Sequence, residues 1–180
     1  MLSEPIDLSI VDATQIINHL YEFFHRDFIS TDTYLAGEIY INPQCHRKTD
    51  GKEDTFWHLT TRKEKEVEWV NGRRHVRILE RYPDFRRASR LEWVRQIITN
   101  HQDASIKLFY HKETNSKKNI RLYLWAKDDD FVVILQKLGR ASSFLVTSFY
   151  VDHQRKKNDY QVRYNNYINN ENGLRDYSWF

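Results

Sequence analysis

Residues 105–151 read SIKLFYHKETNSKKNIRLYLWAKDDDFVVILQKLGRASSFLVTSFYV, and this stretch carries the strongest signal for the fold class. It contains four runs rich in β-branched and aromatic residues, which are typical of strands; they are 105–112, 120–127, 131–138 and 143–151. The polar segments between them are seven residues or shorter. Connections this short join antiparallel neighbours, because a parallel pair needs a crossover of about a dozen residues. The stretch therefore predicts a four-stranded antiparallel β-meander.

Two amphipathic helices are expected upstream of these runs. Apolar residues recur at spacings of three and four between Asp12 and Phe28, with Asp12 or Thr14 available as N-cap. Asp84 can cap a second helix, over 85–100, whose apolar residues have the same spacing. The sequence thus predicts an α+β fold, with helices packed on a four-stranded antiparallel meander and a smaller N-terminal helix and strand extension.

Shorter elements are expected elsewhere. The segments 34–41 and 55–61 have the composition of strands. The Asn71-Gly72 pair is typical of a type I′ hairpin turn, although the preceding EKEVEWV is also compatible with a helix. The basic, Asn-rich segment 153–180 is expected to form a terminal helix that frays into a tail.

Composition limits the classes of protein to consider. A chain of 180 residues with 40% hydrophobic and 14% aromatic residues can form one domain and is not a disordered polymer. The single cysteine, Cys45, excludes a disulfide scaffold and the usual four-ligand zinc site. The N-terminus has no signal-peptide pattern and no segment is apolar enough for a membrane span, so we expect a soluble, cytoplasmic protein without a membrane partner.

Positive charge is concentrated in one part of the chain. The formal net charge is +3, but 46–90 holds thirteen Lys/Arg against eight Asp/Glu. Such a segment favours an anionic partner, or forms a solvated surface. No phosphate loop, dinucleotide fingerprint, HExxH, CxxC or GxSxG pattern is present, so no cofactor and no metal ion is expected.

The segment FWHLTTR, residues 56–62, is the first candidate site. In a strand, alternation would place His58, Thr60 and Arg62 on one face. An imidazole can move a proton, a guanidinium can hold a phosphate, and a hydroxyl can orient either group. The alternative is the water-facing side of a half-buried strand.

Arginines form the second candidate site. On a helix over 85–100, Arg87 falls within the apolar arc and Arg90 at its edge. A buried cation without a partner is costly, so these arginines line a phosphate-binding cleft, pair with carboxylates such as Glu80, or extend their charged ends to solvent.

The last β-rich run supplies further candidates. Thr147 alternates there with Leu145, Phe149 and Val151, whereas Ser148 alternates with Phe144, Val146 and Tyr150. Lys127 and Lys137 close two other runs and either add charge at the ends of the sheet or are plain surface charges.

Four segments resemble one nuclease superfamily. They are FWHLTTR (56–62), RRASRLEWVRQII (86–98), LYLWAKDDDFVVILQK (122–137) and FLVTSFYVD (144–152). In this order they resemble the phage-associated, toxin-like branch of the Barnase, EndoU, colicin E5/D and RelE (BECR) superfamily. The resemblance covers about 56–152 and divides the single domain 1–180 into an N-terminal extension (1–50), a nuclease-like core (55–152) and the tail (153–180).

The resemblance implies a metal-independent endoribonuclease that leaves a 2′,3′-cyclic phosphate. It assigns proton transfer to His58, phosphate binding to Arg87 and Arg90, and a hydroxyl to Thr147 or Ser148. It assigns Tyr150 to base stacking or to proton donation. The chain departs from the family pattern in one respect, because no second catalytic histidine of the EndoU kind is evident.

The residue patterns above add Thr60, Arg62, Lys127 and Lys137 as further expected substrate contacts. The resemblance also implies partners. The expected partner is RNA, such as tRNA or another structured RNA, with an antitoxin or immunity protein as a second expected partner.

Two other classes share the same basic residues. One is a nucleic-acid-binding protein without catalysis, and the other is a protein-interaction or immunity module whose basic face meets an acidic partner.

Overall fold

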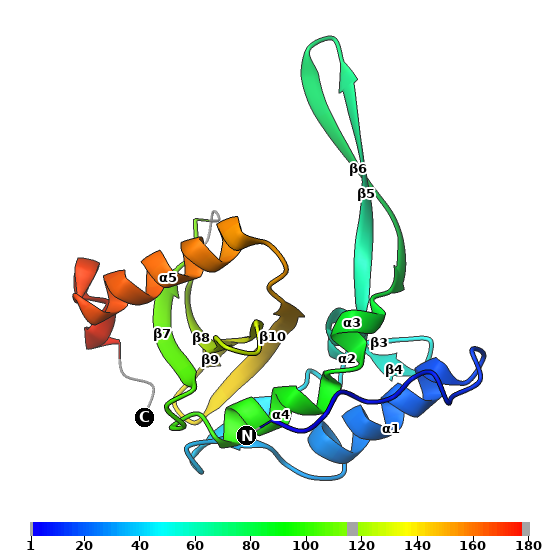
Figure 1. Ribbon diagram of the computed structural model, residues 1–180, viewed down its shortest axis with the longest axis horizontal. Helices are drawn as coiled ribbons and strands as arrows, with labels where there is room; N and C mark the ends of the chain where they lie inside the picture. Colours follow the sequence, from blue (N-terminus) through cyan, green and yellow to red (C-terminus); the bar gives the residue numbers. More distant parts are fainter. Residues whose placement is uncertain (1, 115–118, 178–180) are drawn as a thin grey trace.

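The structure is a computed structural model that describes residues 2–114 and 119–177, without the side chains at 64, 65, 76 and 78–80. Its centre is a curled sheet of six strands in the order β1-β2-β10-β9-β8-β7 (Figure 1). These strands are β1 (Tyr34–Leu35), β2 (Ile39–Asn42), β7 (Ile106–Lys112), β8 (Ile120–Ala126), β9 (Phe131–Leu138) and β10 (Ser142–Tyr150). The α+β class is confirmed, whereas the predicted sheet of four strands is too small.

Connection length explains how the strands pair. β7, β8, β9 and β10 pair in turn as antiparallel neighbours. β2 joins β10 in parallel, with Tyr40 opposite Ser142, because the long chain between them provides the crossover. The strand predicted over 34–41 is interrupted by a turn at Ala36 and Gly37, both with positive φ, which folds β1 back on β2.

The central strands β8 and β9 are buried on both faces. Alternate residues of β8 belong to two different clusters, Leu122 and Leu124 to one and Tyr123 and Trp125 to the other. This arrangement explains why their sequences are almost continuously apolar, as expected for strands covered on both sides.

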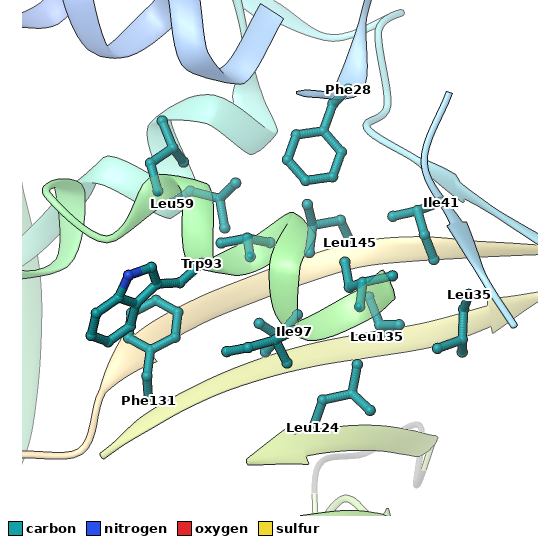
Figure 2. Close-up of a cluster of buried hydrophobic side chains, with 14 of the residues drawn as sticks. Phe28, Leu35, Ile41, Leu59, Trp93, Ile97, Leu124, Phe131, Leu135 and Leu145 are labelled. Atoms are coloured by element: carbon teal, nitrogen blue, oxygen red, sulfur yellow. The ribbon is translucent and has the colours of Figure 1, made fainter. Parts of the chain in front are cut away.

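Helices cover both faces of the sheet. α1 (Ile16–Phe28) and α4 (Leu91–Thr99) pack on one face, where Trp93 and Ile97 meet Phe131, Leu135 and other core residues (Figure 2). α5 (Gln154–Ile168) packs on the other through Tyr160, and the 3-10 helix η1 (Glu171–Asp176) follows it. The terminal helix predicted after residue 153 is present as α5, which ends at Ile168, and residues 178–180 lie outside the described part.

The predicted helix over 85–100 is two helices, α3 (Phe85–Ala88) and α4. Asp84 caps α3 as expected, since its carboxylate accepts a hydrogen bond from Arg87 N at 3.2 Å. The break follows at Ser89, whose carbonyl accepts from Ile6 N at 2.7 Å. The Ser89 carbonyl therefore binds the N-terminal segment. In a continuous helix it would accept a hydrogen bond from the backbone N–H four residues later.

The prediction of a strand over 55–61 is wrong, because this segment is the helix α2 (Asp54–Thr60). Phe56, Leu59 and Thr60 are buried at helical spacing, and the Phe56 ring packs edge-on against Phe24 of α1. Seven residues are too few for periodicity to separate a helix from a strand.

A small hairpin fixes where α2 begins. It consists of β3 (Lys48–Thr49) and β4 (Lys52–Glu53), which pair as antiparallel neighbours. The buried carboxylate of Glu53 pairs with Lys48 Nζ at 3.1 Å and accepts from the Tyr21 hydroxyl at 2.9 Å. These contacts hold the residue that precedes α2 against α1.

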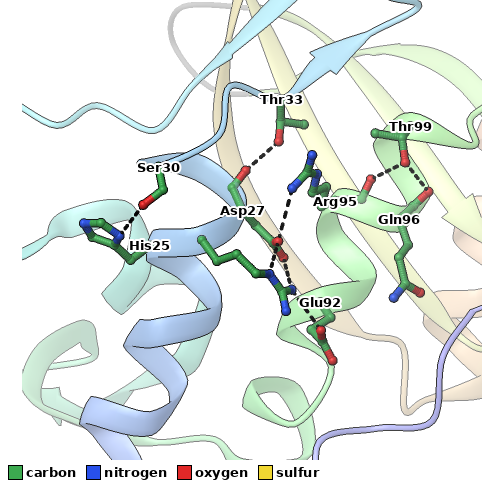
Figure 3. A network of polar contacts seen from close by, with 9 residues as sticks. His25, Asp27, Ser30, Thr33, Glu92, Arg95, Gln96 and Thr99 are labelled. Carbon is green, nitrogen blue, oxygen red and sulfur yellow. Dashed lines mark hydrogen bonds and ion pairs between the residues drawn. The ribbon is translucent and has the colours of Figure 1, made fainter.

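A second polar network holds α1 against α4. Asp27 is buried and pairs with Arg26 at 2.8 Å and with Arg95 at 3.4 Å, while its carbonyl accepts from Thr33 (Figure 3). Arg26 also reaches Glu92 of α4 at 2.9 Å. The two helices therefore pack as one layer.

The strands β5 (Thr61–Val70) and β6 (Arg73–Pro83) form a long hairpin that projects away from the sheet (Figure 1). Asn71 and Gly72 both have positive φ, as a type I′ turn requires. The predicted hairpin turn is confirmed, and the helical alternative for EKEVEWV is wrong. The base of the hairpin lies beside α2 and α3.

Candidate functional site

α2 places His58 on the rim of a pocket of about 500 Å³ at the base of the hairpin. Because Phe56 and Leu59 face the core, the side chain of His58 lies on the opposite, exposed side of the helix. The pocket is lined by Ile17, Thr49, Asp50, Asp54, Trp57, His58, Thr61, Lys63, Arg81 and Pro83.

Hydrogen bonds keep the pocket wall in place. Arg81 Nε donates to Thr61 Oγ1 at 2.8 Å, and Arg81 Nη2 donates to the Trp57 carbonyl at 3.3 Å. Thr49 binds both Trp57, through its carbonyl, and Asp54, through its hydroxyl. The cation of Arg81 is thus held beside His58.

The surroundings of His58 favour its neutral form. Partial desolvation, followed by the positive charges of Arg81 and Lys63, lowers the pKa of His58 below its ordinary value of 6.5. Arg87 acts in the same direction, whereas Asp54 opposes it. The imidazole is therefore unprotonated at neutral pH and free to accept a proton.

Replacing Arg81 by Gln is expected to raise the pKa of His58. Loss of this neighbouring positive charge makes the imidazolium less costly, so the pKa moves back toward 6.5. A pH titration of the histidine resonances by NMR measures the change, with Arg74→Gln at the hairpin tip as matched control. An unchanged or lower pKa in the Arg81→Gln protein contradicts this electrostatic account.

Arg87 joins three segments that are distant in the sequence. Its Nη1 donates to the Thr61 carbonyl at 3.2 Å, and its Nη2 donates to Thr147 Oγ1 at 2.5 Å. Its Nε has no hydrogen-bond partner within the described residues. Burial lowers the pKa of Arg87 to about 10, so the guanidinium remains charged at neutral pH.

Arg87 also borders a second, smaller pocket of about 280 Å³. The lining residues are Arg62, Asp84, Arg87, Phe149, Tyr150, Asp152, His153 and Lys156. Arg62 is paired there with Asp84 at 2.9 Å, while Lys156 Nζ lies 3.8 Å from the centre of the Phe149 ring. Desolvation lowers the pKa of Lys156.

The two pockets are neighbours. Thr61 lines the first, and its carbonyl accepts a hydrogen bond from Arg87 at the edge of the second. Thr61 therefore connects the pocket of His58 with Arg87. The structure brings Arg87 and Thr147 into contact and places His58 next to them in the adjoining pocket.

Arg90 and Tyr150 take part in a cluster of cation–π contacts. The Tyr150 ring has Arg86 Cζ at 3.7 Å and Arg90 Cζ at 5.1 Å from its centre. Arg90 also lies over Trp93 and donates to the Arg86 carbonyl at 2.6 Å. Arg90 lines neither pocket, whereas Tyr150 lines the second.

Other residues singled out from the sequence lie elsewhere. Thr60 is in the core, where its hydroxyl donates to the Phe56 carbonyl at 2.9 Å, so it shares no face with His58. Ser148 is also buried. Lys127 lies over Trp125 in a pocket beside α5, and Lys137 is exposed near the end of β9.

An irregularity in β10 alters the predicted alternation. The pairing of β10 with β9 shifts register between Leu145 and Thr147. Leu145 belongs to the core under α4, whereas Phe149 and Val151 belong to the cluster under α5. Simple alternation predicted that Thr147 and Leu145 share a face of the sheet. The register shift puts them on different faces.

The sequence analysis did not select three cations that line the two pockets. They are Lys63, Arg81 and Lys156. Lys63 and Arg81 lie at the base of the hairpin, and their approach to His58 follows from the pairing of Lys63 with Arg81 across β5 and β6. The local excess of basic residues was the available signal. Glu80, expected as a partner for the arginines, has a side chain outside the described set.

No protein-family model, curated protein or solved structure matches the chain. Within residues 2–114 and 119–177, no group of three or more His, Cys, Asp or Glu side chains is placed to hold a metal ion. None of the helices in that part of the chain is long and apolar enough to cross a bilayer.

Proposed function

We propose that the protein is an endoribonuclease that cleaves RNA without a metal ion and leaves a 2′,3′-cyclic phosphate. The observation that carries this proposal is the position of His58 in a pocket that also presents Arg81 and Lys63, where partial desolvation and these two cations lower the pKa of the imidazole. A general base must be unprotonated, and the phosphate it works beside must be held by positive charge. Lys63 and Arg81 meet both requirements, because they help to lower the pKa of His58 and they can hold the phosphate.

In the proposed reaction, His58 accepts the proton of the ribose 2′-hydroxyl. The 2′-oxygen then forms a bond to phosphorus, the bond from phosphorus to the 5′-oxygen breaks, and the leaving oxygen takes a proton from water. Lys63 and Arg81 stabilise the charge that develops on the phosphate oxygens. Arg87, bound to the Thr61 carbonyl, adds positive charge beside the pocket, and Thr147 holds its guanidinium in place.

The resemblance of four segments to the BECR superfamily supports the same reaction. A nucleic-acid-binding protein without catalysis would use the cations equally well, but it has no need of a histidine whose pKa is lowered. His58 therefore favours cleavage over binding alone.

Incubation with RNA in the presence of EDTA tests the proposal. We expect cleavage, with 2′,3′-cyclic phosphate on the new ends detected by mass spectrometry. Intact RNA after incubation with folded protein, or ends that carry only a 5′-phosphate, would contradict the proposal.

A further inference from the structure

The β5–β6 hairpin extends directly from the candidate site. Lys63 of β5 and Arg81 of β6, which line the His58 pocket, lie at its base. β5 has ten residues, and at about 3.3 Å per residue the turn at Asn71-Gly72 lies about 30 Å from that base. Figure 1 shows the hairpin projecting from the rest of the molecule beyond its base beside α2 and α3.

Charge is distributed unevenly along this hairpin. Residues 61–83 contain seven Lys/Arg against four Glu, a net charge of +3 that equals the formal charge of the whole chain. The acidic residues lie at 64, 66, 68 and 80, so the segment 69–79 contains no acidic residue. The excess of positive charge is therefore at the tip.

The strand register shows which cations are uncompensated. Arg77 lies opposite Glu66 and His75 lies opposite Glu68. By contrast, Arg73 lies opposite Val70 and Arg74 opposite Trp69. Within the described residues, neither Arg73 nor Arg74 has an ion pair or a hydrogen bond from its side chain, and both are exposed.

The tip also exposes a large aromatic ring. Trp69 is 70% exposed, and Val70 beside it is 46% exposed. An indole in water can stack on an unpaired base, and a neighbouring guanidinium can hold the adjoining phosphate. Arg74 is paired directly with Trp69 and shares its face of the hairpin, whereas Arg73, paired with Val70, lies on the other face and adds positive charge at the turn. Trp69 and Arg74 together match the chemistry of a single-stranded nucleic acid.

We propose that Trp69 and Arg74, with Arg73 adding positive charge at the turn, form a binding site for an unpaired stretch of the RNA whose scissile phosphate lies in the His58 pocket. This inference rests on the proposed function, which makes RNA the occupant of that pocket. The charge of the tip complements the phosphate backbone, and Lys63 and Arg81 supply positive charge again at the base, beside the proposed cleavage site. The hairpin would hold the strand without taking part in bond cleavage.

Binding of a fluorescent single-stranded RNA to the full-length protein tests this inference. Trp69→Ala is expected to weaken binding about 5- to 100-fold, the usual effect of losing one stacked base. Arg73→Ala/Arg74→Ala is expected to lower the slope of log affinity against log salt concentration by about 0.7 for each phosphate that the arginines neutralise. Arg77→Ala is the matched control and should change binding less, because Glu66 lies opposite it.

Cleavage kinetics separate this site from the catalytic one. The tip variants should raise KM for a long single-stranded RNA but leave kcat unchanged, and they should not affect cleavage of a dinucleotide. A parent protein that binds RNA through the tip without cleaving it would support an RNA-binding site at the tip and refute the proposed function.

Three results would overturn the inference. The first is unchanged RNA affinity in both tip variants, whose exposed positions leave the folded core intact. The second is equally tight binding of fully paired RNA, since Trp69 then has no unpaired base to stack on. The third is a dimer of the parent protein that dissociates on Trp69→Ala without loss of RNA affinity, which would assign the tip to a second copy of the chain.

Discussion

Replacement of His58 by Ala is expected to lower the rate of RNA cleavage by about 10²- to 10⁴-fold, the usual contribution of a positioned general base. His58 is exposed on the outer side of α2, whose core contacts come from Phe56 and Leu59. The substitution should therefore leave the thermal unfolding temperature nearly unchanged. Single-turnover cleavage of a labelled RNA measures the rate.

Two further variants sharpen this test. His58→Gln keeps polarity and approximate size but accepts no proton, so it should be as inactive as His58→Ala. His46→Ala removes an exposed histidine from the loop before β3 and should retain the parent rate. A His58→Ala protein that cleaves as fast as the parent would show that another group removes the 2′-hydroxyl proton.

The pH dependence of the parent follows from the lowered pKa of His58. Because the base must be neutral, kcat/KM should stay level through neutral pH and fall only as the pH drops through a value below 6.5. The Arg81→Gln substitution raises the pKa of His58, so the fall in kcat/KM on acidification should begin at a higher pH.

Arg87→Ala is the second substitution with a large expected effect. Loss of a preorganised cation near the reacting phosphate typically costs about 10²- to 10³-fold in kcat. The free energy of unfolding should also fall, because the Arg87 side chain connects β5 to β10 through Thr61 and Thr147.

Thr147→Val separates the two roles of Arg87. It removes the acceptor at 2.5 Å but keeps the guanidinium, so it should cost stability with a much smaller loss of kcat than Arg87→Ala. Free guanidinium ion added to the Arg87→Ala protein should restore part of the rate. An Arg87→Ala protein with lower stability and an unchanged kcat would reduce Arg87 to a structural role.

Local patterns were sufficient for much of the fold. The four β-rich runs after residue 105 pair as their short connections require. The Asn71-Gly72 turn and the helix ending at Phe28 also follow from signals within a few residues.

The errors arose where distant contacts decide the structure. α2 is a helix because Phe56 packs against α1, and the helix over 85–100 is interrupted where Ile6 binds Ser89. The parallel pairing of β2 with β10 depends on partners about a hundred residues apart, for which the sequence contains no local signal.

The candidate site, too, was predicted where local residue chemistry is informative and missed where distant contacts place the residues. Residue chemistry alone was enough to select His58, Arg87 and Thr147 as candidates. Lys63 and Arg81 were missed because each is an ordinary surface cation until hairpin pairing places both beside α2. Thr60 was chosen from a strand alternation that does not exist in α2.

The most direct measurement of the central claim compares two RNAs that differ only at the cleaved nucleotide. One carries the ordinary ribose, and the other carries a single 2′-deoxyribose at the nucleotide on the 5′ side of the cleaved bond. If the 2′-hydroxyl is the nucleophile activated by His58, the first RNA is cut at that bond and the second stays intact there. Equal cleavage of both RNAs would contradict the account.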